Sequence, residues 1–178
     1  MLKILAYVAG ALAVAILAIL GYAATQPDSF RIARSTSIKA PAEKIFPLID
    51  DLHGFNTWNP FLKKDPATRV TYSGPASGTG ARNAWDGSGQ TGAGEMEIVS
   101  SSPSSNVTLK LHIIRPFEAV NQVMFTLEPK GGTTTVTWAM TGRNAFIGKV
   151  IGVFMNVDRM VGGDFENGLA DLKALSEK

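Results

Sequence analysis

The feature that most constrains this chain is an uncharged apolar run near its N-terminus. Residues 4–24 contain no charged side chain over 21 positions. A helix of that length would be roughly 31 Å long at about 1.5 Å per residue, close to the hydrocarbon thickness of a bilayer. From Thr25 onward the chain has the composition of a soluble domain. We therefore predict one compact domain held at a membrane, with residues 1–28 forming the anchor (or a signal peptide) and its linker.

The flanks of this run bear on its orientation and on its retention. Lys3 is the only charged side chain before it, and a short basic N-terminus favours staying in the cytoplasm, which places the domain outside. A cleaved signal peptide is the competing interpretation, because Gly21 and Ala23 are small residues where a signal peptidase needs them. The run is longer than the usual signal h-region of about 7–15 residues, which favours an uncleaved single-pass anchor. Cleavage would instead give a secreted or periplasmic protein.

Composition excludes several classes of function. The 17 basic and 15 acidic residues are nearly balanced, so the chain has no charge footprint for nucleic acid. The absence of cysteine excludes disulfides, thiolate metal sites and cysteine nucleophiles. Residues 29–178 have the length of a single domain with a core of its own.

Short alternating segments dominate the middle of the chain. Val107, Leu109 and Leu111 alternate with polar residues, as in a strand with one buried face. The glycine-containing residues 129–132 separate two such segments, which is a hairpin signal. The predicted strands are residues 29–38, 69–72, 80–85, 95–100, 107–114, 120–127 and 133–140. Regular short strands of this kind indicate one antiparallel sheet.

Helical signals flank these strands. Residues 41–49 and 58–61 predict two short helices after the first strand. Towards the C-terminus apolar residues recur at three- and four-residue steps, which predicts a long amphipathic helix over residues 146–175. Gly162 and Gly163 should weaken or bend its middle. We expect this helix to cover the apolar face of a curved sheet and to leave a cavity between them, an α+β architecture.

Six segments in this order resemble the START-like (SRPBCC) superfamily, in its polyketide cyclase/dehydrase branch. They are IKAPAEKIF (38–46), WNPF (58–61), YSGP (72–75), GTGARNAW (78–85), GTTTVTW (132–138) and DFENGLADLK (164–173). The resemblance covers the chain from about residue 30 and implies a helix-grip fold, in which a bent antiparallel sheet grips a long C-terminal helix around an apolar cavity. It also implies binding of lipids, sterols, polyketides or other apolar molecules, with catalysis in a minority of members. The N-terminal span is an addition to the minimal family domain.

A cavity in such a fold would be lined by inward strand residues and by the inner side of the last helix. Val136, Trp138 and Met140 share one face of the last predicted strand, and methionine suits a wall that adapts to irregular ligands. Ordinary core packing also explains each of these residues taken singly. The candidate lining residues are Trp58, Phe61, Trp85, Met124, Phe125, Val136, Trp138, Met140, Ile151, Phe154, Met155 and Asp158.

Candidates for catalysis are few. His53 and His112 are the only histidines, and both have ordinary interpretations, at a helix end and on a solvated strand face. Asp158 lies on a largely apolar helix, where a carboxylate turned into a cavity could act as an acid or hold a polar group of the ligand, although a surface ion pair is the plainer interpretation. Residues 87–92 match the dinucleotide fingerprint in letters, but no helix follows them to hold a pyrophosphate. No metal-ligand spacing occurs, so we expect neither a metal nor a cofactor.

These observations favour a membrane-anchored module that binds an apolar small molecule or a lipid, with the cavity mouth held near the bilayer. An enzyme of the polyketide cyclase/dehydrase type, using Asp158 or a histidine as acid and base, is the first alternative. A stress-related module that binds another protein is the second. The scarcity of catalytic side chains favours binding over catalysis.

Overall fold

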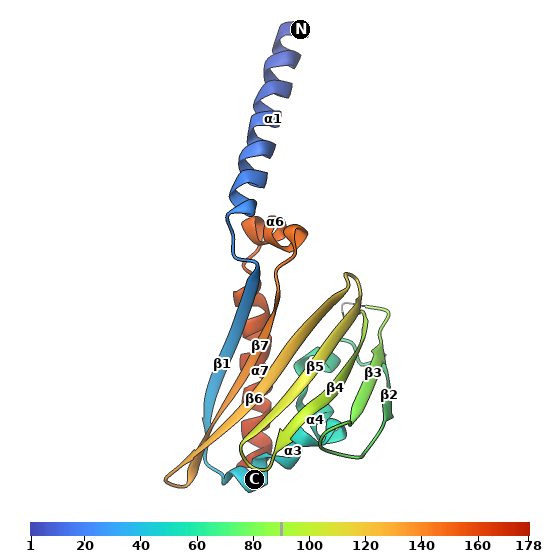
Figure 1. The fold of residues 1–178 in the computed structure, drawn as a ribbon, viewed down its shortest axis with the longest axis vertical. Coiled ribbons are helices and arrows are strands. Elements are labelled where there is room, and N and C mark those ends of the chain that lie inside the picture. Colours follow the sequence, from blue (N-terminus) through green and yellow to red (C-terminus); the bar gives the residue numbers. More distant parts are fainter. Residues whose placement is uncertain (90) are drawn as a thin grey trace.

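The computed structural model describes residues 1–89 and 91–178, apart from the side chain of Leu2. Helix α1 (Leu2–Ala24) projects from one end of a β-sheet domain (Figure 1). Its mean hydropathy is 2.5 over Lys3–Ala24, and its described side chains are exposed except for Ile19 and Ala23 near its C-terminal end. The length and composition of α1 suit a membrane span, although a signal sequence would fit the same description.

Within the described residues, seven antiparallel strands form one sheet in the order β1-β7-β6-β5-β4-β3-β2. Each predicted strand is present, with bounds that differ by a few residues, and the first strand pairs with the last. The β6–β7 hairpin turns through Gly131 and Gly132, whose φ values of 57° and 81° suit residues without a Cβ atom. The strands are β1 (Ser29–Ile38), β2 (Arg69–Ser73), β3 (Arg82–Asp86), β4 (Ala93–Ser102), β5 (Asn106–Arg115), β6 (Ala119–Lys130) and β7 (Thr133–Arg143).

Alternation along the strands gives the sheet an inner face, which packs on the helices, and an outer face. Residues that pair across adjacent strands lie on the same face. On the outer face, Lys110, Gln122 and Thr141 are neighbours across β5, β6 and β7. The inner face of β3 to β7 carries Asn83, Trp85, Gly94, Met96, Ile98, Val107, Leu109, Leu111, Ile113, Asn121, Val123, Phe125, Leu127, Val136, Trp138, Met140 and Gly142.

In the described chain four short helices follow β1, where the sequence predicted two. Prolines and side-chain caps divide them, since Pro47 and Pro60 occupy first helical positions and the Asn59 side chain accepts a hydrogen bond from the Phe61 backbone N–H. The helices are α2 (Ala42–Ile45), α3 (Pro47–Asp50), α4 (Leu52–Trp58) and α5 (Pro60–Lys64).

The predicted single helix over residues 146–175 is divided into α6 (Phe146–Phe154) and α7 (Val157–Ser176). Met155 between them has an extended backbone, and the Asn156 side chain accepts a hydrogen bond from the Arg159 backbone N–H at 2.8 Å, which caps α7. The apolar spacing continues through this break, so the periodic pattern conceals it. Helix α7 runs without a break through Gly162 and Gly163, where the sequence predicted a weakened or bent middle.

Helix α7 packs mainly along β1 and also contacts β7, α2, α4 and α5 (Figure 1). Its Phe165 ring stacks on the ring of Trp138 with centroids 4.1 Å apart. Phe125 and Trp58 complete this aromatic cluster, with centroids 5.0 Å and 5.6 Å from Trp138. The long C-terminal helix and the antiparallel sheet confirm the expected helix-grip fold.

Candidate ligand-binding site

The space where the sequence predicted a cavity, between the sheet and the C-terminal helix, is filled by the aromatic cluster. Trp58 and Phe125 are 0% exposed and Trp138 is 3% exposed. Val136 is also fully buried beside them. Four of the candidate lining residues, Trp58, Phe125, Val136 and Trp138, therefore pack together as core under the helices.

Two of the hollows formed by the described residues lie outside the space between the sheet and α7. The larger, of about 560 Å³, is an open trough on the outer face, and its lining includes Lys110, Gln122 and Thr141. The smaller, of about 110 Å³, lies between α4 and the β2–β3 hairpin, beside His53 and Tyr72. Neither is the cavity that the sequence predicted.

The inner face changes from closed to open along the strands. On β5, Val107 and Leu109 are 0% exposed, whereas Leu111 and Ile113 on the same face are half-buried. On β3, Asn83 is buried and Trp85 is half-buried. The inner face therefore keeps apolar surface within reach of solvent at the end of the strands that carries Ile113 and Trp85.

Pairing places this open end on the side of the domain from which α1 projects. Asn121 on the inner face pairs with Leu111 and with Gly142, near the end of β7. Two residues after Gly142, the backbone N–H of Asn144 donates a hydrogen bond to the carbonyl of Asp28 in the linker that follows α1. The open part of the inner face and the base of α1 thus share one end of the domain.

The position of Trp85 at the open end depends on a hydrogen bond and on a glycine, Gly94, that the sequence analysis did not single out. The indole Nε1–H donates a hydrogen bond to the Thr91 carbonyl at 3.1 Å. A Cβ atom on Gly94 would overlap the Trp85 ring, so only glycine lets the ring lie against β4. Gly94 is therefore required for the position of Trp85.

Polar groups interrupt the otherwise apolar inner face. Asn83 Oδ1 and Trp138 Nε1 are buried and have no hydrogen-bond partner among the described residues. Asn121 is 7% exposed and lies between Leu111 and Gly142. A buried polar atom without a partner costs free energy, so the acceptor at Asn83 is suited to a polar group of a ligand or to water, whereas Trp138 Nε1 lies within the packed aromatic cluster. Strand parity alone signals both asparagines, because each falls on the apolar face of its strand.

Several predicted lining residues lie elsewhere. Met124 is 41% exposed on the outer face, because alternation along β6 turns it away from Phe125. Ile151 and Phe154 belong to α6, and Met155 ends it, so these three lie near α1 and not on the inner face. The remaining candidates lie on the core side of the sheet. Met140 belongs to the core, and the half-buried Phe61 and Trp85 pack against it.

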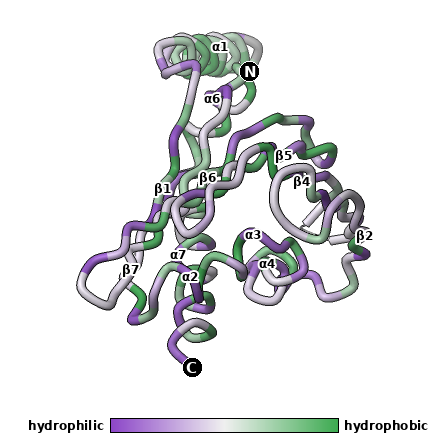
Figure 2. The backbone as a smooth tube through the Cα atoms, turned by 60° about the horizontal axis from the view of Figure 1, so that its bottom comes forward, coloured by the Kyte–Doolittle hydropathy of each residue, from purple (hydrophilic) through white to green (hydrophobic). Residues whose placement is uncertain are grey.

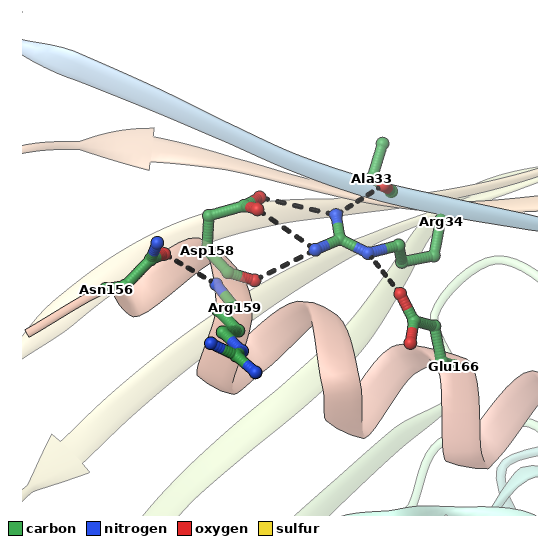
Figure 3. Close-up of polar contacts among 6 residues, drawn as sticks. All are labelled: Ala33, Arg34, Asn156, Asp158, Arg159 and Glu166. Carbon is green, nitrogen blue, oxygen red and sulfur yellow. Dashed lines mark hydrogen bonds and ion pairs between the residues drawn. The ribbon is translucent and has the colours of Figure 1, made fainter.

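Asp158 does not point into a cavity. Its Oδ2 accepts a hydrogen bond from Arg34 Nη2 at 3.0 Å, and this bond from Arg34 lowers the pKa of the Asp158 carboxyl (Figure 3). A carboxylate in that state is a poor general acid. The ion-pair interpretation of Asp158 is therefore the one that the geometry supports.

The two histidines also lie off the inner face. The ring of His53 stacks on Tyr72 with centroids 3.7 Å apart at an exposed position. His112 lies on the outer face between Glu95 and Glu118. Its hydrogen bond to Glu95, and to a smaller extent that to Glu118, raises the pKa of the imidazole. Across residues 1–89 and 91–178, no group of three or more acidic, histidine or cysteine side chains is placed to hold a metal ion.

The fold and its partly open inner face define a helix-grip domain with an apolar concave surface. The sequence model of the family described as "Polyketide cyclase / dehydrase and lipid transport" matches residues 29–177. The chain belongs to this family, and with it to the START-like (SRPBCC) superfamily.

Several solved structures share this fold. Protein MLL2253 from Mesorhizobium loti is 15% identical with a TM-score of 0.60, covering 82% of this chain and 96% of its own. The Aha1 dimer from Colwellia psychrerythraea is 20% identical with a TM-score of 0.56, covering 83% of this chain and 96% of its own. Ginseng major latex-like protein 151 from Panax ginseng is 16% identical with a TM-score of 0.57, covering 83% and 97%. At these identities the likeness is one of fold alone. A search of curated proteins finds no significant match.

Proposed function

We propose that this chain is a membrane-anchored binding protein for an apolar small molecule or lipid. In this proposal residues 1–28 form the anchor and linker and residues 29–178 the ligand-binding domain. The ligand lies on the open end of the inner face, against Leu111, Ile113 and Trp85. The observation that carries the proposal is the half-buried apolar surface at this end, which contrasts with the closed core below it.

The position of this surface supports a ligand that arrives from a membrane. Apolar side chains exposed to water are unfavourable, and an apolar ligand that covers them contributes a binding free energy of roughly 25 cal/mol per Å² of buried apolar surface. The unpartnered Asn83 Oδ1 at the boundary of the closed core would accept a hydrogen bond from a ligand hydroxyl or amide. An amphiphile with a long apolar part and one polar group matches this arrangement.

The packing of α1 supports an uncleaved anchor over a signal peptide. Ala23, at the predicted cleavage region, is 0% exposed, and the end of α1 contacts α6. Cleavage here would remove α1 and uncover the part of α6 that it contacts. With Lys3 as the only charged side chain before the span, the proposed orientation keeps the N-terminus in the cytoplasm and the domain outside.

A cyclase or dehydrase reaction receives less support. Such a reaction needs a group that moves a proton, and the inner face of β3 to β7 carries neither a carboxylate nor a histidine in the described residues. The polar groups there are amides, an indole and hydroxyls such as that of Thr134, which bind and orient but do not exchange protons near neutral pH. We therefore place binding ahead of catalysis.

Photocrosslinking in a bilayer tests the proposal. The full chain is reconstituted in nanodiscs with a diazirine-bearing fatty acid, irradiated and mapped by peptide mass spectrometry. Crosslinks are expected on β3 to β5 in addition to those on α1. Leu111→Trp fills the apolar surface and should lower the inner-face crosslinks several-fold while leaving those on α1 unchanged.

Met124→Trp is the matched control, since Met124 is exposed on the outer face. It should leave both sets of crosslinks at the level of the unmodified chain. Crosslinks confined to α1, or an equal loss in both variants, would remove the proposed site.

A further inference from the structure

Helix α6 exposes an apolar face of its own. Phe146, Ile147 and Phe154 are 52%, 58% and 69% exposed. With about 3.6 residues per turn these three side chains point to one side of the helix, within roughly 100° of one another. We call them the α6 apolar face. Met155 and Met160, which are 45% and 55% exposed, extend this surface beyond the helix.

The one charge on α6 is turned away from that face. The Lys149 side chain is only 8% exposed, and its Nζ donates a hydrogen bond to Asp28 Oδ1 at 2.5 Å. The hydrogen bond from Lys149 lowers the pKa of Asp28, so the aspartate stays ionised and matches the lysine charge. The α6 apolar face therefore carries no charge of its own that would resist entry into lipid.

Contacts to the linker fix α6 beside the base of α1. Asn144, just before α6, donates hydrogen bonds from its backbone N–H to the Asp28 carbonyl at 2.8 Å and from its side chain to the Pro27 carbonyl at 3.3 Å. Ala23, near the C-terminal end of α1, is fully buried, and α1 contacts α6. Figure 1 shows α6 next to the end of α1 that joins the domain, and Figure 2 shows both helices on the same side of the domain. The α6 apolar face thus belongs to a helix that packs beside the base of α1.

Aromatic residues on α1 indicate the level of the membrane interface. Tyr7 and Tyr22 are 78% and 58% exposed near the two ends of the helix. They are separated by roughly 22 Å along the axis at about 1.5 Å per residue, and tyrosine is enriched where hydrocarbon meets headgroups. Tyr22 lies at the end of α1 that joins the domain, where α6 is also found, so α6 lies at the interface level (Figure 1).

We propose that α6 is an interfacial helix, lying in the surface of the bilayer that α1 spans with Phe146, Ile147 and Phe154 among the acyl chains. This inference rests on the proposed anchoring of α1. A short helix with one apolar face and no free charge on that face lies in an interface and does not cross it. Two points of attachment hold the domain at a fixed tilt, with the open end of the inner face towards the lipid.

The absence of cysteine makes a labelling test direct. Single-cysteine variants of the full chain carry a nitroxide at Ile147, Phe154, Leu12 or Met124, in vesicles of phosphatidylethanolamine and phosphatidylglycerol. Collision rates with oxygen, which concentrates in lipid, and with a water-soluble nickel chelate are compared. Leu12 is in the middle of α1, and Met124 is an exposed position on the outer face of the sheet.

The ratio of oxygen to nickel collisions at Ile147 and Phe154 should be several-fold above the ratio at Met124 and below that at Leu12. A lipid-like ratio at Leu12 with water-like ratios at Ile147 and Phe154 would overturn the interfacial helix while leaving the anchor intact. Water-like ratios at all four positions would overturn the anchor and, with it, this inference.

Discussion

The guanidinium of Arg34 on β1 lies directly against the backbone of Gly162 on α7, so this contact is part of the packing of α7 on β1. Arg34 Nε donates a hydrogen bond to Glu166 Oε1 at 2.7 Å, and Nη2 donates one to Asp158 Oδ2 at 3.0 Å (Figure 3). A Cβ atom at position 162 would overlap the guanidinium, whereas one at Gly163 meets open space. The adjacent glycines therefore differ in role, because only Gly162 makes room for a side chain from the sheet.

The first prediction separates these two glycines. Gly163→Ala should raise the free energy of unfolding by about 1 kcal/mol, because alanine is the better helix former and nothing obstructs it. Gly162→Ala should fail to realise that gain, since the methyl group displaces Arg34 from its two partners. Urea unfolding of the full chain in detergent, followed by circular dichroism, measures both variants.

A double variant provides the control for this comparison. In an Arg34→Ala background the obstruction is gone, so Gly162→Ala should become stabilising, as Gly163→Ala is. Equal effects of the two glycine variants in the unmodified chain would show that Arg34 yields freely and does not fix α7.

The second prediction concerns how the stability contributed by Asp158 changes at acidic pH. The hydrogen bond from Arg34 lowers the pKa of Asp158, so its contribution to stability is present above the ordinary carboxyl pKa of about 3.9 and is lost as pH falls through the lowered value. Asp158→Asn should therefore lower the midpoint of thermal unfolding at neutral pH, and the gap to the unmodified chain should narrow on acidification. A gap that stays constant down to strongly acidic pH would contradict the ion-pair role.

Most of the fold could be predicted from the sequence because alternation in the strands is a local signal. Val136, Trp138 and Met140 share the inner face as predicted, and the hairpin at Gly131 formed where the glycines indicated it. Met124 was misplaced beside Phe125 although the same alternation separates them, since adjacent strand residues cannot share a face.

The candidate site could be predicted only in part, because the shape of the space on the inner face depends on contacts between segments that are distant in the chain. Apolar spacing cannot show whether an inward Trp138 lines a cavity or stacks on Phe165, which is decided by how closely α7 approaches the sheet. That approach requires Gly168 on α7, because a Cβ atom there would press against the Trp138 ring and against Pro60. No local pattern records such a contact.

The third prediction concerns His112. Hydrogen bonds to Glu95 and then Glu118 raise its pKa, so the stability it contributes is fully present below the ordinary histidine pKa of about 6.5 and is lost as pH rises through the raised value. NMR titration of the full chain in detergent should place the His112 midpoint above that ordinary value. Glu95→Gln should move the midpoint down, whereas Glu43→Gln, on α2, should leave it in place.

The fourth prediction concerns the break between α6 and α7. Asn156→Ala removes the cap on the Arg159 backbone N–H and should lower the free energy of unfolding by about 1 kcal/mol, whereas Asn156→Ser keeps an acceptor and should lose much less.

The same substitution tests whether the break positions α6. Alanine also favours continuation of the helix through Met155, which would draw α6 away from α1. Nitroxide labels at Tyr22→Cys and Ile147→Cys report this separation by pulsed electron resonance. The distance distribution should broaden towards longer values in Asn156→Ala and stay narrow in Asn156→Ser. An unchanged narrow distribution in Asn156→Ala would show that Asn144 and Lys149, through their bonds to the linker, hold α6 without help from the cap.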